Sequence, residues 1–434
     1  MIHCIVQREK NNIFAGVDFW LVLFYIILIF LGWLNIYAAS TSEDHTEILD
    51  FGAVYGKQLI WIGLAVPLII IVLFIETRFY ERFASLFYIA SILSLIGLFI
   101  FGKNINGAQS WYAIGSSTLQ PSEFAKAFTA LAVAKLLSDK AFTFRPFKNH
   151  VKAFFLIFLP ALLITLQPDP GSALVYFAFL FVFYREGLPP YYFVIGFLLI
   201  ILFLLTLYFG SYISIPIMIY VISGVFIFIL GYLSIYKQRV LKRNWLQFLT
   251  TFFIICGYIL SVKYIFNNIF EERHRNRFNI ILGKTTDIQG VGYNTNQAIK
   301  TIASGGFTGK GYLEGDRTQG KFVPEQDTDY IFSTVGEEWG FIGSTLVIIL
   351  FIAFMFRIIH VAERQKSTFS RVYGYSIATI FFFHFMVNIG MVIGLVPTIG
   401  IPLPFFSYGG SSLWGFTLLL FIFIRLDANR SYEW

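Results

Sequence analysis

Long apolar runs follow one another along almost the whole chain and are separated by shorter polar segments. A helix needs about 20 apolar residues to cross a bilayer. Read between charges, glycines and prolines, the runs predict twelve spanning helices, at 19–39, 58–75, 82–101, 122–138, 151–167, 172–185, 190–209, 213–236, 245–266, 331–357, 372–396 and 411–426. We therefore expect an all-α, polytopic transmembrane bundle of about 10–12 helices that forms one membrane domain over residues 1–434.

The composition agrees with a lipid-facing surface, because 57% of the residues are hydrophobic and only 13% are charged, against about 25% charged in soluble domains. The net charge of +7 does not indicate nucleic acid, since Lys and Arg retained in cytoplasmic loops give the same excess. Cys4 and Cys256 fit neither a disulfide framework nor a metal site. The first apolar run is longer than the ~7–15 residues of a signal peptide core, which predicts an uncleaved helix.

The charges of the connecting loops predict which side of the membrane each one faces. Cations gather in 138–150, 237–244, 357–371 and the C-terminal tail, whereas acids dominate 40–57. Since positive loops stay in the cytoplasm, both termini are expected to be cytoplasmic. Four polar stretches then face the other side, at 102–121, 167–171, 267–330 and 397–411.

The loop 267–330 has about 60 residues, whereas connections usually have about 4–6, and loops this long are functional or disordered. Its isoleucines and phenylalanines predict a folded loop that packs onto the helices. Three carboxylates, Glu325, Asp327 and Asp329, crowd its end. Repulsion and partial desolvation raise the pKa of at least one of them, which would make it a useful proton acceptor. The alternative is a helix cap by Asp327 or Thr328, which would still let Asp329 point into a cavity.

Two further polar groups interrupt apolar runs. Glu123 and Lys126 are spaced i,i+3 on one helical face, and they serve either a cavity or a structural ion pair. Asp169 lies in the turn QPDPGS, which is either a polar site or a simple hairpin between helices.

The basic run 273–277 contains Arg275 and Arg277 on the predicted outer side, against the positive-inside trend. Binding an anion such as a lipid phosphate would explain these cations, and charge balance with Glu271 and Glu272 is the alternative.

Residues 388–412 carry so many glycines and prolines that they break a helix within an apolar span. Irregular backbone at membrane depth is tolerated where it is buried in protein or lines a cavity, although small residues also allow close helix packing. Other motifs fail. The glycine-rich stretch 304–311 lacks Walker spacing, Ser234–Lys237 lacks the partners of a penicillin-binding serine enzyme, and the six histidines form no zinc motif.

Seven stretches together resemble the SEDS family (shape, elongation, division and sporulation), the FtsW/RodA/SpoVE proteins. They are NGAQSW (106–111), QPSEFAK (120–126), QPDPGSA (167–173), GYNTNQAIKTIASGGFTGKG (292–311), VPEQDTDYIF (323–332), GEEWGFIG (336–343) and NIGMVIGLVPTIGIPLPFFSYGGSS (388–412). Within them, GIPLPF is more similar to the elongation branch, RodA, than to the division branch.

The resemblance implies a peptidoglycan glycosyltransferase of the bacterial cytoplasmic (inner) membrane, which polymerises lipid II for cell elongation and shape. The essential Asp of the family's PE-x-x-TD motif falls on Asp329. That residue would deprotonate the GlcNAc 4-hydroxyl of one glycan, which attacks C1 of another's MurNAc and releases undecaprenyl diphosphate. The alternatives are a lipid II flippase and a non-catalytic scaffold. Implied partners are a class B penicillin-binding protein, other elongation-complex membrane proteins, lipid II and membrane lipid, but no nucleic acid.

Motif matches and local chemistry give one catalytic candidate, Asp329, and a set of expected substrate-binding residues. These are Trp111, Glu123, Lys126, Asp169, Arg275, Arg277, Lys310, Glu325, Asp327, Ser407 and Ser411. The cations among them would bind the departing diphosphate, with or without a divalent ion such as Mg²⁺ or Mn²⁺.

The chain departs from the family pattern at three places. Ser110 stands where the family has Arg, Asp327 stands where a His is common, and twelve spans are predicted where the family has ten. The extra pair lies within 190–266. Because the polar motifs gather on one side of the membrane, the pattern favours surface chemistry over a path for transport.

Overall fold

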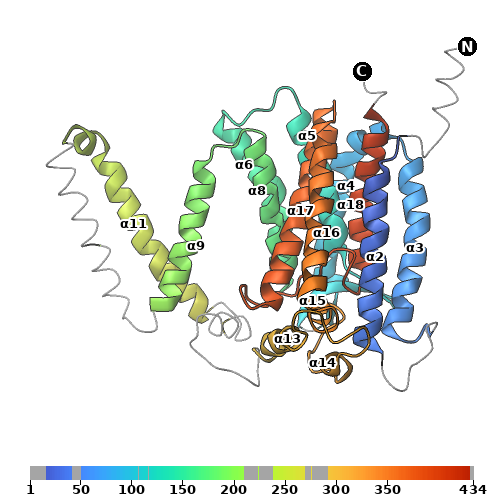
Figure 1. The fold of residues 1–434 in the computed structure, drawn as a ribbon. Helices are drawn as coiled ribbons and strands as arrows, with labels where there is room; N and C mark the ends of the chain where they lie inside the picture. Colours follow the sequence, from blue (N-terminus) through green and yellow to red (C-terminus); the bar gives the residue numbers. More distant parts are fainter. Residues whose placement is uncertain are drawn as a thin grey trace, which may run out of the picture. The chain divides into compact units, whose positions relative to one another are not determined.

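The computed structural model describes residues 16–41, 50–105, 107–115, 117–209, 223, 238–268, 275 and 292–430. The chain divides into two compact units, Pro189–Gly292 and the rest. Within the described residues, nine helices are long and apolar enough to cross a membrane, as drawn in Figure 1. The protein is therefore a multi-pass membrane protein, as the apolar runs predict.

The larger unit is a bundle of long helices. They are α2 (Phe19–Ser40), α3 (Val54–Phe74), α4 (Thr77–Phe101), α5 (Pro121–Ser138), α6 (Phe147–Thr165), α16 (Gly340–Glu363), α17 (Thr368–Val392) and α18 (Gly410–Ala428). Helices α5 and α18 are buried on most of their faces, whereas α3 and α4 expose most of theirs. A helix that is apolar all round and buried belongs to the interior of a bundle. Gly415 allows the close approach, because a Cβ there would lie 3.0 Å from the backbone oxygen of Glu123.

The predicted spans coincide with helices wherever the structure describes them, and 213–236 lies outside the described residues apart from residue 223. Two spans differ in detail. The predicted span 172–185 is a short broken helix, formed by α7 (Pro170–Leu174), a 3₁₀ turn η1 (Val175–Ala178) and α8 (Phe179–Arg185). The predicted span 331–357 is divided into α15 (Ile331–Glu338) and α16.

The break between α15 and α16 occurs at Gly340, whose φ is +66°. A Cβ at this position would lie 2.2 Å from the backbone nitrogen of Gly309. Backbone of the long loop therefore occupies the space where a continuous helix would carry a side chain, and only glycine combines that contact with a positive φ.

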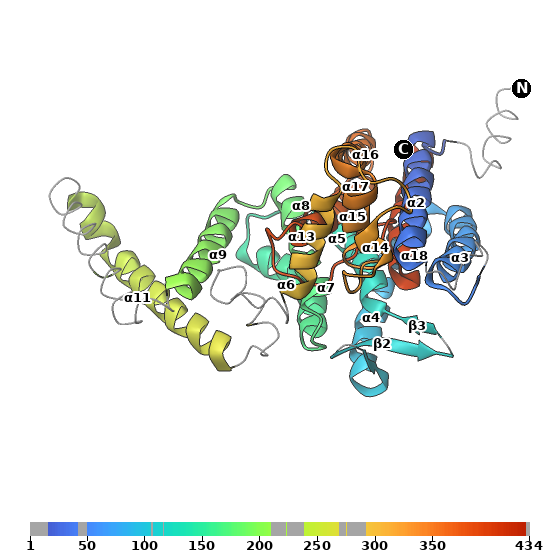
Figure 2. The ribbon, with the colours of Figure 1, turned by 60° about the horizontal axis from the view of Figure 1, so that its bottom comes forward.

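A small sheet that the apolar pattern did not predict lies between α4 and α5. Its strands are β1 (Lys103–Ile105), β2 (Ala108–Ile114) and β3 (Ser117–Leu119), paired antiparallel in that order. Figure 2 shows β2 and β3 beside α4. The Tyr112 hydroxyl donates to the backbone oxygen of Ser94 at 2.8 Å, and the Gln109 N–H donates to that of Gln167 at 3.2 Å. These bonds fix the sheet to α4 and to the turn after α6.

The described part of the long loop, from residue 292, contains α13 (Tyr293–Ser304) and α14 (Asp316–Gln319). Tyr312 and Gln319 donate side-chain hydrogen bonds to backbone oxygens of α2. The carboxylate of Glu337 on α15 accepts hydrogen bonds from a set of loop donors, namely Ser304, Lys310, Arg317 and Thr318. The prediction of a folded loop is confirmed for residues 292–330, and 269–291 lies outside the described residues apart from residue 275.

The smaller unit contains α9 (Tyr191–Phe209) and α11 (Gln238–Asn268). Its core is formed by Leu207, Val262 and Phe266. The hydroxyl of Tyr258 donates to the backbone oxygen of Leu199 at 3.1 Å, which adds a polar bond between the two helices. These helices cover most of the region in which the sequence places an additional pair.

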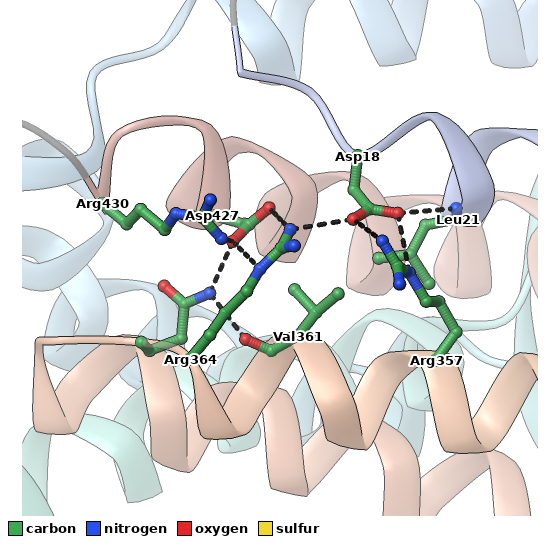
Figure 3. Close-up of polar contacts among 8 residues, drawn as sticks. Asp18, Leu21, Arg357, Val361, Arg364, Asp427 and Arg430 are labelled. Carbon is green, nitrogen blue, oxygen red and sulfur yellow. Dashed lines mark hydrogen bonds and ion pairs between the residues drawn. The ribbon is translucent and has the colours of Figure 1, made fainter.

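An ion cluster joins α2, α16 and α18 where α2 begins and α18 ends (Figure 3). Asp18 accepts from Arg357 at 2.6 Å and from Arg364 at 2.8 Å. Arg364 also pairs with Asp427, which is further bonded by Gln365 and Arg430. We call this the termini end of the bundle. Because two carboxylates share three guanidinium groups, every charge in the cluster has a partner of opposite sign.

Candidate active site

A cleft of about 660 Å³ opens at the other end of the bundle, where α3, α5 and α18 begin. It is lined by Phe51, Lys57, Ile60, Trp61, Trp111, Ser117, Thr118, Gln120, Glu325, Thr328, Asp329, Gly400, Pro402 and 408–412. Three of the four polar stretches singled out in the sequence therefore meet here, together with the start of α3. The Gly/Pro-rich stretch 388–412 lines a cavity through its part 397–411 and Ser412, as its composition predicts, and we call 397–411 the broken segment.

Asp329 lines the cleft just before α15, and both its backbone N–H and its backbone carbonyl form hydrogen bonds. Its N–H donates to the Glu325 oxygen at 3.1 Å, and its own carbonyl accepts from Asn388 Nδ2 at 2.9 Å. The same Nδ2 donates to the Ile401 oxygen at 2.7 Å, and Asn388 is fully buried. This one amide therefore ties the backbone at Asp329 to the broken segment.

Gly400 faces the side chain of Asp329. A Cβ on Gly400 would lie 3.2 Å from Asp329 Oδ2, and the φ of Gly400 is +79°. The carboxylate is therefore packed against bare backbone, a close approach that a larger residue would obstruct. Together with the bonds of Asn388, this contact sets the position of Asp329 in the cleft.

The capping interpretation of the acidic run is wrong. Helix α15 begins at Ile331, and its N-cap residue Tyr330 provides no side-chain cap. The hydroxyl of Thr328 instead donates to Glu325, whose carboxylate is exposed and whose φ of +53° is unusual for a side-chain-bearing residue. Strained backbone of this kind is most common at functional sites.

Asp327 lies between the two cleft carboxylates in sequence but does not line the cleft. Its backbone oxygen accepts from the Tyr408 N–H at 2.9 Å, which joins the acidic run to the broken segment. Burial raises the pKa of the Asp327 carboxyl, and the negative charge of Glu325 raises it further. The two aspartates of the motif thus have different surroundings.

The starts of α5 and α18 are bonded to each other beside Trp111 of β2. The Ser411 hydroxyl accepts from the Gln120 N–H at 3.1 Å and donates to the Thr118 oxygen at 3.4 Å. Gln120 Nε2 donates to Asp169 Oδ2 at 2.9 Å, and the other oxygen of Asp169 caps α7 through the Ser172 N–H. Asp169 therefore stabilises the turn before α7 and orients the cleft residue Gln120, but it does not line the cleft itself.

Glu123 and Lys126 form an ion pair of 2.8 Å inside the bundle. Both are buried, and Lys126 Nζ also lies 3.0 Å from His384 Nε2 and 5.0 Å from the centre of the Phe416 ring. His384 Nδ1 lies 3.1 Å from the oxygen of Pro402, a cleft residue. The structure thus places this pair behind the cleft, where it supports the broken segment.

Two further candidates in the larger unit, Lys310 and Ser407, do not line the cleft. Lys310 is bonded to Glu337 at 2.7 Å and to Asp316 at 3.0 Å. Ser407 is buried and accepts from the Leu403 N–H, so it stabilises a turn. Arg275 belongs to the smaller unit, where it donates to the Asn267 oxygen, and Arg277 lies outside the described residues.

Sequence reasoning missed Lys57, Trp61, Gln120 and Tyr408, which all line the cleft. A signal for Lys57 exists, since it is the cation of an otherwise acidic segment on the side predicted to face away from the cytoplasm. Trp61 packs against Gly410, where a Cβ would lie 2.7 Å from the ring. The aromatic groups Trp61 and Trp111, beside polar hydroxyls and amides, suit a sugar whose faces are apolar and whose edges are hydroxylated.

Comparisons with known proteins agree with this geometry. The sequence model of the FtsW/RodA/SpoVE cell cycle proteins matches residues 19–229 and 221–432. The chain is 30% identical over 437 residues to the peptidoglycan glycosyltransferase RodA of Treponema pallidum (strain Nichols), covering 95% of this chain and 98% of that protein. It is 31% identical over 352 residues to the peptidoglycan glycosyltransferase MrdB of Escherichia coli (strain K12), covering 81% of this chain and 80% of that protein.

Solved structures have the same fold. One chain of a peptidoglycan synthase complex, described as coordinating polymerization and crosslinking, has a TM-score of 0.69 and 24% identity, covering 96% of this chain and 99% of that chain. The rod shape determining protein RodA of Thermus thermophilus has a TM-score of 0.60 and 23% identity, covering 96% of this chain and 98% of that chain.

Proposed function

Because the chain belongs to the FtsW/RodA/SpoVE cell cycle protein family, we propose that it is a peptidoglycan glycosyltransferase. It joins lipid II disaccharide units into glycan strands, releases undecaprenyl diphosphate, and acts in cell elongation and shape. The observation that carries this proposal is the position of Asp329, a carboxylate fixed against Gly400 in a 660 Å³ cleft at one end of the bundle. Two relatives that align with most of the chain are named as peptidoglycan glycosyltransferases.

In the proposed reaction Asp329 accepts the proton of the GlcNAc 4-hydroxyl. The oxygen then forms a bond to C1 of the MurNAc of a second lipid II, and the bond from C1 to the diphosphate oxygen breaks with its electron pair. A base held at hydrogen-bond distance from the hydroxyl accelerates such a step. Neighbouring N–H groups and cations stabilise the charge that develops on the leaving group.

We further propose that the cleft faces away from the cytoplasm and that both chain ends are cytoplasmic. The described loops at the termini end and the helix starts that follow them support this orientation, because they carry a set of cations comprising Lys140, Arg145, Lys148, Arg364, Lys366 and Arg371. Lys and Arg concentrate in cytoplasmic loops. In this orientation the base meets lipid II sugars on the outer surface of the inner membrane.

A flippase would need ionisable groups along the whole depth of the bundle. In the part of the chain that the structure describes, the cleft and the pair Glu123–Lys126 lie at one end and the cluster of Asp18 and Asp427 lies at the other. Glu123 and Lys126 within the bundle are also paired with each other rather than open to a path. This arrangement favours chemistry at one surface over transport.

The experiment that tests the proposal supplies fluorescent lipid II to the purified protein in detergent, with its proposed class B penicillin-binding partner. The structural likeness to a chain of a peptidoglycan synthase complex motivates that pairing. We expect glycan polymers to form. In proteoliposomes, transfer of lipid II between leaflets without polymer would instead indicate a flippase. Polymer made by the partner alone, at the same rate, would indicate a scaffold.

A divalent ion would bind only together with the substrate. No group of three or more His, Cys, Asp or Glu side chains suited to a metal occurs among the described residues. Glu325 and Asp329 both line the cleft, and Mg²⁺ is commonly held by one or two carboxylates plus substrate phosphates. Glu325 would therefore hold Mg²⁺ or Mn²⁺ together with phosphate oxygens of the substrate, the ion would neutralise phosphate charge, and Asp329 would remain the base.

If an ion binds in this way, EDTA should lower the polymerisation rate, and Mg²⁺ or Mn²⁺ should restore it. Glu325→Gln should raise the Mg²⁺ concentration needed for half-maximal rate, because the carboxylate that would hold the ion is lost. Measuring the rate against Mg²⁺ concentration for both proteins checks this. A rate unaffected by EDTA would exclude the ion from the reaction.

A further inference from the structure

Lys57 is an exposed lysine at the end of the first turn of α3, and it lines the cleft with Trp61 and Trp111. Among the described residues that line the cleft it is the only cation, whereas Glu325 and Asp329 are both acidic. None of the ion pairs formed within the described part of the chain includes Lys57. Within the described residues its charge is therefore not committed to an ion pair.

The cations expected to bind the leaving group are committed elsewhere. Lys126 is buried against Glu123 and His384, and Lys310 is shared by Glu337 and Asp316. A diphosphate entering a cleft with two carboxylates meets repulsion unless a cation offsets it. Within the described lining, only Lys57 can supply that charge directly.

The starts of three helices surround the same part of the cleft. Lys57 follows the start of α3, Gln120 is the N-cap of α5, and Gly409 is the N-cap of α18. None of these N-caps provides a side-chain hydrogen bond to its helix. The first N–H groups of a helix carry a partial positive charge and bind anions, so the backbone adds to the field of Lys57.

Bonds between these elements keep them together. Gln58 Oε1 accepts from the Gly409 N–H at 3.2 Å, and Trp414 Nε1 donates to the Trp61 oxygen at 3.1 Å. Both bonds join α3 to α18, and the Ser411 hydroxyl joins α18 to α5. Lys57 is thus carried on a rigid junction rather than on a loop.

We infer that Lys57, with the starts of α5 and α18, forms the diphosphate site of the cleft. This inference rests on the proposed function and states which part of the cleft binds which substrate group. The diphosphate of the glycan that is attacked at C1 lies at Lys57, and the attacking hydroxyl lies at Asp329. Lys57 stabilises charge on the leaving group, and Asp329 accepts the proton of the attacking hydroxyl.

The test measures binding of farnesyl diphosphate, farnesyl monophosphate and farnesol to the full-length protein in detergent. Wild type should bind the diphosphate most tightly. Lys57→Gln should weaken diphosphate binding about 10- to 100-fold, the usual effect of removing a hydrogen bond to a charged group, and should leave farnesol binding unchanged. Lys57→Arg should stay within a few-fold of wild type. Lys152→Gln, an exposed lysine on α6, is the matched control and should change nothing.

The inference is overturned if Lys57→Gln keeps the preference for diphosphate, or if it weakens all three ligands equally while its elution profile and thermal stability match those of wild type. A polymerisation assay run in parallel separates the two proposals. Polymer from wild type together with unchanged diphosphate binding by Lys57→Gln would reject the site alone. Lys57-dependent binding without any polymer from wild type would reject the polymerase alone.

Discussion

Replacing Asp329 by Asn is expected to lower the rate of glycan polymerisation by about 10²- to 10⁴-fold, the usual contribution of a general base. Asparagine has the same shape, and the backbone bonds from Asn388 and to Glu325 remain. The variant therefore loses proton acceptance without losing its position against Gly400. The measurement is initial polymerisation rate against lipid II concentration, in which we expect the maximal rate to fall and the apparent affinity to stay.

Asp327→Asn is the matched control for this prediction. Asp327 belongs to the same acidic run, but its side chain does not line the cleft, and its backbone bond to Tyr408 survives the change. We expect Asp327→Asn to keep most of the activity. If the two variants lose activity to the same extent, the assignment of the base to Asp329 is wrong.

Replacing Glu337 on α15 by Ala should strongly destabilise the folded loop that packs onto this helix. The Glu337 carboxylate is buried and accepts from Lys310, Ser304 and the backbone of α14. Removing one partner of a buried pair leaves the others unsatisfied and costs about 3 kcal/mol. We expect a thermal midpoint several degrees lower in detergent and faster proteolysis within residues 305–322.

Asp316→Asn provides the control for Glu337, because Asp316 bonds the same ammonium group of Lys310 but is 85% exposed. Exposed ion pairs contribute little, so its thermal midpoint should stay close to that of wild type. An equal loss in both variants would show that Lys310, rather than the buried carboxylate, stabilises the loop.

The stabilisation by Glu337 should also depend on pH. Burial by itself raises the pKa of this carboxyl, but hydrogen bonds from Lys310 and Thr318 outweigh it, so the folded pKa is below the ordinary value of 4.5. The stabilisation is therefore complete above that value and disappears as the pH falls through the lower folded pKa. The difference in thermal midpoint between wild type and Glu337→Ala should accordingly shrink below about pH 4.5.

The helices could be predicted from the sequence because the side chains that face lipid must be apolar. The apolar runs at 19–39, 82–101 and 372–396 coincide closely with α2, α4 and α17. The small sheet and the break at Gly340 could not be predicted in this way. The strands are short and held by bonds to α4 and to Gln167, and the break depends on Gly309, which is thirty-one residues away in sequence.

Cleft residues that belong to a recognisable sequence motif could be predicted. The roles of residues that depend on their neighbours in space could not. Asp329 and Ser411 lie on the cleft as the motifs indicate. Whether a Lys or Arg can bind substrate depends on whether a carboxylate lies next to it in the fold, and the sequence alone does not show this. Lys310 meets Glu337 across 27 positions, whereas Lys57, which no motif marks, forms no ion pair within the described residues.

The ion cluster at the termini end has a consequence for how the protein is made. Asp18 precedes the first long helix, but its partners Arg357 and Arg364 are synthesised hundreds of residues later. Asp427, at the end of the last helix, completes the cluster. The same last helix supplies Ser411 and Ser412 to the cleft. A nascent chain on the ribosome therefore lacks a complete cleft until α18 has been made, and translation products that stop before α18 are expected to be inactive.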